Sequence, residues 1–318
     1  MSPLDLASFV RRVCDRALQR ADEATLHADQ RRLLRETLSR FNGHCDPSDP
    51  AQPLGLFHLV AQVRGPVEPR LLVHLASFCW LYTCSLDLFD DMQDDDLAGK
   101  PHEQAGPAIA VNSALALLFL ALDELRLATR LESRIEPRRG YAELFNRISL
   151  LTVGAQHADL LGGSAAGSPA DVLEMNRGKT ASVALFLECA SLAAGASLDE
   201  AAAYGGVGLD LAGLVQIVDD VRDIYGKDHS PDLLTGKYTY PLACFRESAS
   251  PAQLAQLEVL LAQRPLPLVE IRELIHEAAA MDRCAEEVEA IRERIHGRLA
   301  ELSGAPPQHR VLLDIVDA

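Results

Sequence analysis

The chain has 318 residues, of which 48% are hydrophobic, so it is long and apolar enough to bury a large core. Its formal net charge of −16 argues against nucleic acid and anionic membrane surfaces as partners, because both are polyanions. The seven cysteines form an odd set without a C-x-x-C pair or zinc-ligand spacing. We therefore expect a globular cytoplasmic protein whose cysteines are small core residues.

Prolines divide the chain into long proline-free stretches that are rich in Ala, Leu, Glu and Arg, all good helix formers. No run of alternating β-branched residues predicts a strand. The N-terminal segment carries charges in its first turns and lacks the apolar centre of a signal peptide. We predict an all-α fold with a single domain spanning residues 1–318.

The first strongly apolar stretch, Leu71 to Leu86, contains no Asp, Glu, Lys or Arg and predicts a buried helix. It leads into Asp90-Asp91-Met92-Gln93-Asp94, and Asp87 lies one turn before this motif on the same face. At about 100° per residue, the three aspartates of such a D-D-x-x-D motif share roughly a 100° arc. Crowded carboxylates repel one another and lose hydration on burial, so hard divalent cations are their natural partners.

A second charge-free run, Gly106 to Leu122, is slightly too short to span a membrane and contains Asn112 and Ser113. We interpret it as a buried helix and predict no membrane span. Further along, residues 168–171 (Ser-Pro-Ala-Asp) are typical of a helix start. Residues 268–302 alternate apolar and charged positions at helical spacing and predict one or two amphipathic helices outside the core.

A second D-D-x-x-D motif, Asp219-Asp220-Val221-Arg222-Asp223, also closes an apolar stretch. Gln216 lies at about 60° on the same helical wheel, inside the arc of the aspartates, which favours a polar pocket. One acidic run alone is most often a solvated helix end. Two identical spacings favour instead two facing acidic surfaces that hold several Mg²⁺ ions and a bridging diphosphate.

These motifs resemble those of the trans-isoprenyl diphosphate synthases, or polyprenyl synthetases, of the class I isoprenoid synthase fold. The likeness is strongest over residues 50–245 and includes four more segments in the family's order: Gly154–Leu160, Leu173–Thr180, Gly213–Asp220 and Asp232–Leu242. The resemblance implies a helical bundle around a deep central cavity. It also implies an allylic prenyl diphosphate as substrate, Mg²⁺ as cofactor with three ions when substrate is bound, and a homodimer.

The resemblance further implies roles for individual residues. The expected metal-binding residues are Asp90, Asp91, Asp94, Asp219, Asp220 and Asp223. Asp90, Asp94 and Asp219 are the expected direct ligands, and we count them as catalytic together with Lys179 and Lys237. Both lysines match family lysines that contact the diphosphate.

Four further residues are expected near the substrate. Gln156 and Gln216 either bond neighbouring side chains as buried helix amides or face the cavity and stabilise a cation or an ordered water. Phe89 directly precedes the first motif and is expected beside the substrate. The small side chain of Ser85 indicates room for a C15 or C20 chain, because a bulky residue there shortens the product in the family.

The chain departs from the family where basic side chains normally hold a second diphosphate, that of isopentenyl diphosphate. Residues 64–70, before the first motif, retain Arg64 and Arg70 but contain Glu68. Residues 95–101, after the motif, contain a single basic residue, Lys100. Each lost charge-assisted contact weakens binding by about 1.5–3 kcal/mol. Arg70 remains as a candidate substrate contact.

Three functions are compatible with this pattern. The leading interpretation is Mg²⁺-dependent ionisation of an allylic prenyl diphosphate, with the cation captured by cyclisation, by water or by an acceptor other than isopentenyl diphosphate. The second is a conventional farnesyl or geranylgeranyl diphosphate type synthase whose isopentenyl site uses Arg64, Arg70, His74 and Lys100. The third is a non-catalytic subunit of a heteromeric synthase, which the retention of both acidic motifs disfavours.

Overall fold

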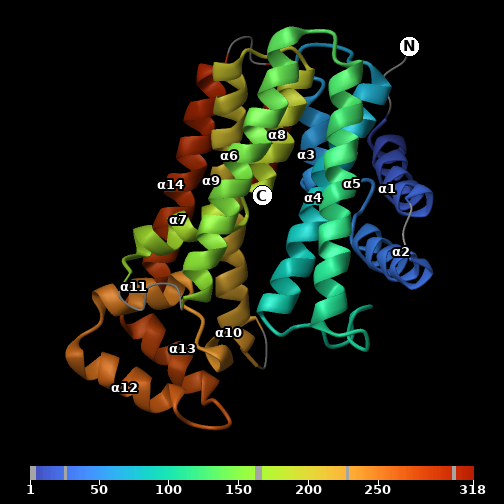
Figure 1. The fold of residues 1–318 in the computed structure, drawn as a ribbon. Helices are drawn as coiled ribbons and strands as arrows, with labels where there is room; N and C mark the ends of the chain where they lie inside the picture. The colour runs from blue at the N-terminus through green and yellow to red at the C-terminus, as the bar shows by residue number, and fades with distance from the viewer. Residues whose placement is uncertain (1–4, 25–26, 162–166, 227–228, 303–305) are drawn as a thin grey trace.

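The computed structural model describes residues 5–24, 27–161, 167–226, 229–302 and 306–318. These residues form fifteen α-helices and no strand, which confirms the all-α prediction. Long helices run roughly parallel to one another and make the frame of the bundle (Figure 1). They are α4 (Pro69–Gln93), α5 (Pro107–Leu131), α6 (Ile135–Leu160), α9 (Leu198–Tyr225) and α14 (Ala280–Glu301).

Shorter helices surround this frame. The N-terminal part contributes α1 (Leu6–Glu23), α2 (Ala28–Gly43) and α3 (Pro53–Val60). The middle of the chain contributes α7 (Pro169–Lys179), α8 (Ser182–Ala193) and α11 (Tyr240–Ser248). Three helices lie at the lower end of the bundle in Figure 1: α10 (Pro231–Thr235), α12 (Pro251–Leu261) and α13 (Leu268–Glu277). The last helix, α15 (Pro307–Asp317), packs against α14.

Helix starts follow the expected local chemistry. α7 begins as predicted at Pro169, and a capping box joins Ser168 and Asp171. α4 begins at Pro69, where Glu68 accepts a hydrogen bond from the backbone N–H of Leu71 (2.6 Å). These caps satisfy backbone donors that have no partner inside the helix.

The apolar stretches form the core of the bundle. α4, α5 and α9 are each long and apolar enough to cross a membrane, judged by length and composition alone. In the fold, 67%, 44% and 56% of their most apolar windows are buried, respectively. Core packing therefore accounts for much of the apolar character of α4 and α9, whereas α5 leaves more of its surface uncovered.

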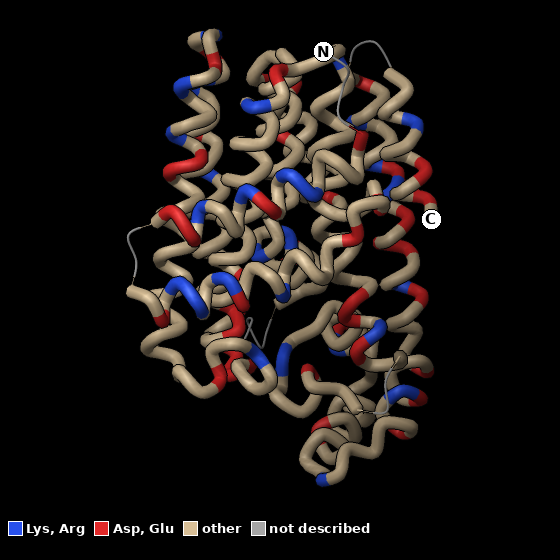
Figure 2. Tube along the Cα trace, turned by 90° about the vertical axis from the view of Figure 1, so that its right-hand side faces the viewer, with Lys and Arg blue, Asp and Glu red and all other residues tan. Residues whose placement is uncertain are grey.

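The C-terminal region contains two helices, α13 and α14, separated at Ala279, whose φ of 55° is left-handed. α14 packs against α9 and α11 and buries Cys284, Ile291 and Ile295. All seven cysteines are free, and six of them are buried. Acidic and basic positions are intermixed along most helices (Figure 2).

Candidate active site

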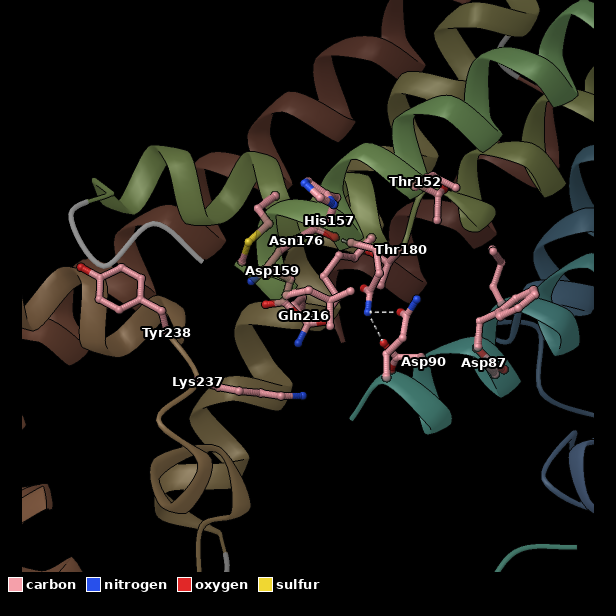
Figure 3. A pocket seen from close by; sticks show the side chains of 18 of the residues that line it. Asp87, Asp90, Thr152, His157, Asp159, Asn176, Thr180, Gln216, Lys237 and Tyr238 are labelled. Atoms are coloured by element: carbon pink, nitrogen blue, oxygen red, sulfur yellow. Dashed lines mark hydrogen bonds and ion pairs between the residues drawn. The ribbon is translucent and has the colours of Figure 1, made fainter. Parts of the chain in front are cut away.

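A cavity of about 540 Å³ lies where the ends of α4, α6 and α7 approach α9 and the segment after α10 (Figure 3). Its volume is within the range of about 300–1,000 Å³ that is common for small-molecule sites. Both acidic motifs reach its wall, through Asp90 and Asp220. The apolar part of the wall is formed by Leu86, Phe89, Val153, Leu160 and Met175.

Asp90 is held in the last turn of α4 by a residue of α6. The Nε2 group of Gln156 donates to Asp90 Oδ1 (2.7 Å) and to Gln93 Oε1 (2.9 Å). Burial raises the pKa of Asp90, and the positive charge of Lys179 partly opposes this effect. The amide of Gln156 thus bonds neighbouring side chains and also lines the cavity.

Both motifs lie at the C-terminal ends of their helices. α4 ends at Gln93, and Asp95, with a left-handed φ of 55°, turns the chain away. α9 ends at Tyr225, two residues after the second motif. A carboxylate at this negative end of the helix dipole costs about 0.3–1 kcal/mol. Because both motifs place carboxylates at this unfavourable end of a helix, both need nearby cations.

Two lysines supply part of that positive charge. Lys237 Nζ lies 2.5 Å from Asp94 Oδ2, and Lys179 Nζ lies 2.5 Å from Asp159 Oδ2. Lys237 extends from the segment after α10 toward the end of α4 that carries Asp90 (Figure 3). Burial lowers the pKa of Lys237, but the hydrogen bond to Asp94 and nearby carboxylates outweigh it and raise the pKa. Lys237 is therefore a charged ammonium group.

The aspartates of the second motif lie in different surroundings, one on the cavity wall and another exposed. Asp220 faces the cavity and accepts hydrogen bonds from Gln216 Nε2 (3.0 Å) and the N–H of Tyr240 (2.8 Å). Burial raises the pKa of Asp220 to about 6. The side chain of Asp219 is 56% exposed and lies 3.4 Å from Arg222.

Asp223 points toward the start of α10. Its Oδ2 accepts hydrogen bonds from the Ser230 hydroxyl and from the N–H of Asp232 (3.3 Å). Its carboxylate is therefore part of the connection between α9 and α10, and it is not among the residues that line the cavity.

Five other predicted site residues are also not among those that line the cavity: Asp91, Asp94, Asp219, Ser85 and Arg70. Asp91 points toward Lys100, whose Nζ is 2.6 Å away. The hydroxyl of Ser85 is buried and donates to the Ala114 carbonyl (2.8 Å). Arg70 is exposed at the opposite end of α4, about 30 Å from Asp90 at 1.5 Å per residue. The structure therefore does not place Arg70 or Ser85 on the wall of this cavity.

The basic residues expected for a conventional isopentenyl site are dispersed. Arg64 forms an ion pair with Glu200, and His74 Nδ1 lies 2.6 Å from Glu124. Lys100 binds Asp91 and Asp96, each at 2.6 Å. None of these basic residues, nor Arg70, is among the residues that line the described cavity.

The aspartates fit Mg²⁺ chemically, but they do not form a ready-made ligand set. Among the described residues, no three His, Cys, Asp or Glu side chains are grouped closely enough to hold a metal ion. Asp90 and Asp220 nevertheless present carboxylate oxygens to the same cavity, and such hard ligands are those that Mg²⁺ prefers.

Several residues that line the cavity were not predicted as site residues: Asp87, Asp159, Asn176, Asp232 and Thr239. Two of them could have been found from their spacing to predicted residues. Asp159 follows Gln156 by three residues, and Asn176 precedes Lys179 by three, so each shares a helix face with a predicted residue.

Comparisons with known proteins agree with this architecture. The family model for polyprenyl synthetase matches residues 56–278 of the chain. A geranylgeranyl pyrophosphate synthetase from Pyrococcus horikoshii superposes with a TM-score of 0.81 at 19% identity, covering 98% of both chains. A decaprenyl diphosphate synthase from Rhodobacter capsulatus gives 0.83 at 20% identity, covering 98% of this chain and 95% of its own. No curated protein matches the chain significantly.

A polyprenyl synthetase from Streptomyces coelicolor is also similar, with a TM-score of 0.80 at 20% identity over 98% of this chain and 99% of the other. At such identities these structures show the fold, whereas the family model covers more than half of the chain. Members of this family are prenyltransferases that generally use Mg²⁺. The chain belongs to the polyprenyl synthetase family.

Proposed function

We propose that this protein ionises an allylic prenyl diphosphate in a Mg²⁺-dependent reaction. The observation that carries the proposal is one cavity in which Asp90 and Asp220 lie near two lysines, Lys179 and Lys237. Bound Mg²⁺ would act as a Lewis acid that neutralises the charge developing on the departing diphosphate. The lysines would bind the same diphosphate, exchanging their present carboxylate partners for phosphate oxygens.

The remaining residues have supporting roles in this proposal. Asp90, Asp94 and Asp220 are the carboxylates best placed to hold Mg²⁺, with Asp219 at the exposed side of the second motif. Three ions with substrate bound remains our expectation. Gln156 and Gln216 would fix the orientation of Asp90 and Asp220, which they already bond. The apolar wall beside Phe89 would receive a C15 or C20 hydrocarbon chain and exclude water from it.

Two fates of the resulting cation each have an observation in their favour. The dispersal of Arg64, Arg70, His74 and Lys100 away from the cavity favours cyclisation, capture by water, or an acceptor other than isopentenyl diphosphate. The similar structures are those of geranylgeranyl, decaprenyl and polyprenyl synthases, and this likeness favours conventional elongation with isopentenyl diphosphate. A non-catalytic subunit is disfavoured by the retention of both acidic motifs and both lysines.

We further propose that the protein is a cytoplasmic homodimer without a membrane span or a nucleic-acid partner. Large apolar side chains are exposed along two neighbouring long helices and would be covered by a second copy. They are Ile109, Val111, Leu115, Phe119, Leu131, Ile135, Leu150 and Leu161, the last lying directly after α6. Exposed large apolar side chains gathered on neighbouring helices are typical of a protein interface.

Product analysis tests the proposed function. Purified protein is incubated with Mg²⁺ and C10, C15 or C20 allylic diphosphates, each with and without isopentenyl diphosphate, and diphosphate release and organic products are measured. Hydrocarbons or alcohols formed without isopentenyl diphosphate indicate capture of the cation within its own chain or by water. Longer diphosphates formed only with it indicate elongation. Absence of diphosphate release under every condition would contradict the proposal.

A further inference from the structure

Asp87 is a carboxylate of the cavity wall that the proposed metal chemistry does not use. It lies in α4 three residues before Asp90, which corresponds to about 4.5 Å along the helix. Leu86 and Phe89, its neighbours in α4, belong to the apolar part of the cavity wall. Figure 3 shows Asp87 on the same helix as Asp90, farther from Lys237. A substrate with its diphosphate near Asp90 would therefore place carbon atoms beside Asp87.

Asp87 differs from the other cavity carboxylates in having no bound partner. Asp90 accepts from Gln156, Asp159 binds Lys179, and Asp220 accepts from the backbone of Tyr240. Within the described parts of the chain, Asp87 forms no hydrogen bond or ion pair. Four residues earlier on the same helix face, the buried hydroxyl of Thr83 also lacks a partner.

The charges around Asp87 leave it as an available base. Asp90 and Asp91 on α4 repel its negative form, while Arg40 of α2 and Lys100 attract it from a distance. Lys100 is already bound to Asp91 and Asp96, and Arg40 lies 3.8 Å from Asp91. The side chain of Asp87 is exposed to the open cavity. Loss of hydration beside the surrounding protein atoms, followed by repulsion from Asp90 and Asp91, raises the pKa of Asp87 to about 7. An unpaired carboxylate in such a place is suited to accept a proton.

We propose that Asp87 is a catalytic base that removes the proton ending the reaction of the prenyl cation. This inference rests on the proposed function, because it requires that the allylic diphosphate is ionised in this cavity. The C–O bond to the diphosphate breaks first and leaves an allylic cation. A C–H bond beside a cationic carbon then breaks, its electron pair forms a C=C bond, and its proton passes to a carboxylate oxygen of Asp87. The carboxylic acid later returns the proton to water.

The test separates ionisation from proton removal by two readouts. Asp87→Asn keeps the shape of the side chain but removes its basicity. The variant should fold, because Asp87 is exposed and forms no hydrogen bond or ion pair in the described parts of the chain that the substitution would break. The measurements are diphosphate release and the ratio of olefin to alcohol, with C15 and C20 diphosphates and Mg²⁺. We expect diphosphate release to stay within about threefold of the wild type while the olefin-to-alcohol ratio falls at least tenfold. Asp87→Glu should restore part of the olefin.

Asp95→Asn is the matched control. Asp95 is exposed, lies just beyond the helix, and has a left-handed φ of 55°, a backbone conformation that Asn tolerates. The Asp95→Asn variant should leave the ratio of olefin to alcohol unchanged. An unchanged ratio in Asp87→Asn, or a loss of diphosphate release in a folded Asp87→Asn protein, would overturn the assignment of Asp87. Absence of diphosphate release from the wild type would instead refute the proposed function, and the role of Asp87 with it.

A binding measurement gives a second, independent readout. A prenyl amine with a tertiary ammonium in place of the cationic carbon mimics the intermediate. Calorimetry should show at least tenfold weaker binding of this amine, in the presence of inorganic diphosphate and Mg²⁺, to Asp87→Asn than to the wild type. Equal affinity for both proteins would contradict a position of Asp87 beside the cation.

Discussion

Lys237 joins two parts of the chain that are 143 residues apart, because its ammonium group binds Asp94 of the first motif. If it also binds the substrate diphosphate, Lys237→Gln removes a charge-assisted contact of about 1.5–3 kcal/mol. We expect kcat/KM for the allylic diphosphate to fall by about 10- to 100-fold. Steady-state rates of diphosphate release at several substrate concentrations measure this change.

Lys100→Gln is the informative comparison for that experiment. Lys100 binds Asp91 and Asp96 and is not among the cavity residues. A small effect on ionisation is expected, and a selective loss of isopentenyl diphosphate use would support conventional elongation. Equal losses from Lys237→Gln and Lys100→Gln would show that the diphosphate is not bound in the cavity described.

Asp223 allows a structural role to be distinguished from metal binding. It accepts hydrogen bonds from the Ser230 hydroxyl and from the backbone of Asp232 at the start of α10. Asp223→Ala should therefore lower the free energy of unfolding by about 1–3 kcal/mol, since buried donors are left without an acceptor. Urea denaturation measures this loss. Ser230→Ala should give a loss that is not additive with it, because both residues share one hydrogen bond.

A contrary result would identify Asp223 as a metal ligand. In that case Asp223→Ala would keep the wild-type free energy of unfolding without Mg²⁺ but would lose turnover and the stabilisation produced by Mg²⁺ with diphosphate.

At the scale of the helix, the second motif depends on close packing between α8 and α9. A Cβ atom at Gly208 of α9 would lie 2.6 Å from Ala184 Cα and 2.8 Å from Ala184 N. Those atoms are backbone and cannot rotate away, so Gly208→Ala should destabilise the fold by about 1–3 kcal/mol through overpacking. It should also impair turnover, since displacement of α9 moves Asp220. Chemical denaturation and activity assays measure the two effects.

Gly297→Ala in α14 is the control for this packing. A Cβ atom at Gly297 would meet nothing within 4 Å, so the same substitution should stabilise the helix by about 0.5–1 kcal/mol. Destabilisation of similar size at both glycines would show that close approach of α8 and α9 is not the cause.

At the scale of the whole molecule, the exposed apolar surface of α5 and α6 predicts self-association. Phe119 is 64% exposed and Leu150 is 68% exposed. Introducing Phe119→Glu and Leu150→Glu together should place unpaired charges in the proposed interface and convert a dimer to a monomer. Sedimentation velocity at micromolar concentration measures the change. Val259→Glu, at a 64% exposed site on α12, should leave the dimer intact.

A monomeric wild-type protein, or a dimer that both sets of substitutions leave unchanged, would refute this interface. The absence of a dimer would also require another explanation for the apolar surface that α5 exposes.

Much of the fold could be predicted because its determinants are local. The helix start at Pro169 was predicted from proline at the first helical position, and a side-chain cap within three residues supports it. The start at Pro69 has the same local chemistry but was not predicted. The apolar run before Asp90 and the absence of strand patterns can be recognised in the local sequence, without knowledge of distant contacts. The boundary between α13 and α14 was not predicted, because Ala279 carries no sequence signal for its left-handed backbone.

The sequence by itself determined that the protein is helical and that two acidic motifs end two apolar helices, since helical periodicity is a property of neighbouring residues. Only the tertiary structure decided which of those carboxylates share a cavity. Neighbours on one helix face, such as Asp90 and Asp91, meet different partners, because packing against other helices fixes the rotation of each helix about its axis. The same packing placed Lys237 beside Asp94, left Arg70 at the far end of α4 and gave Asp87 a place on the cavity wall.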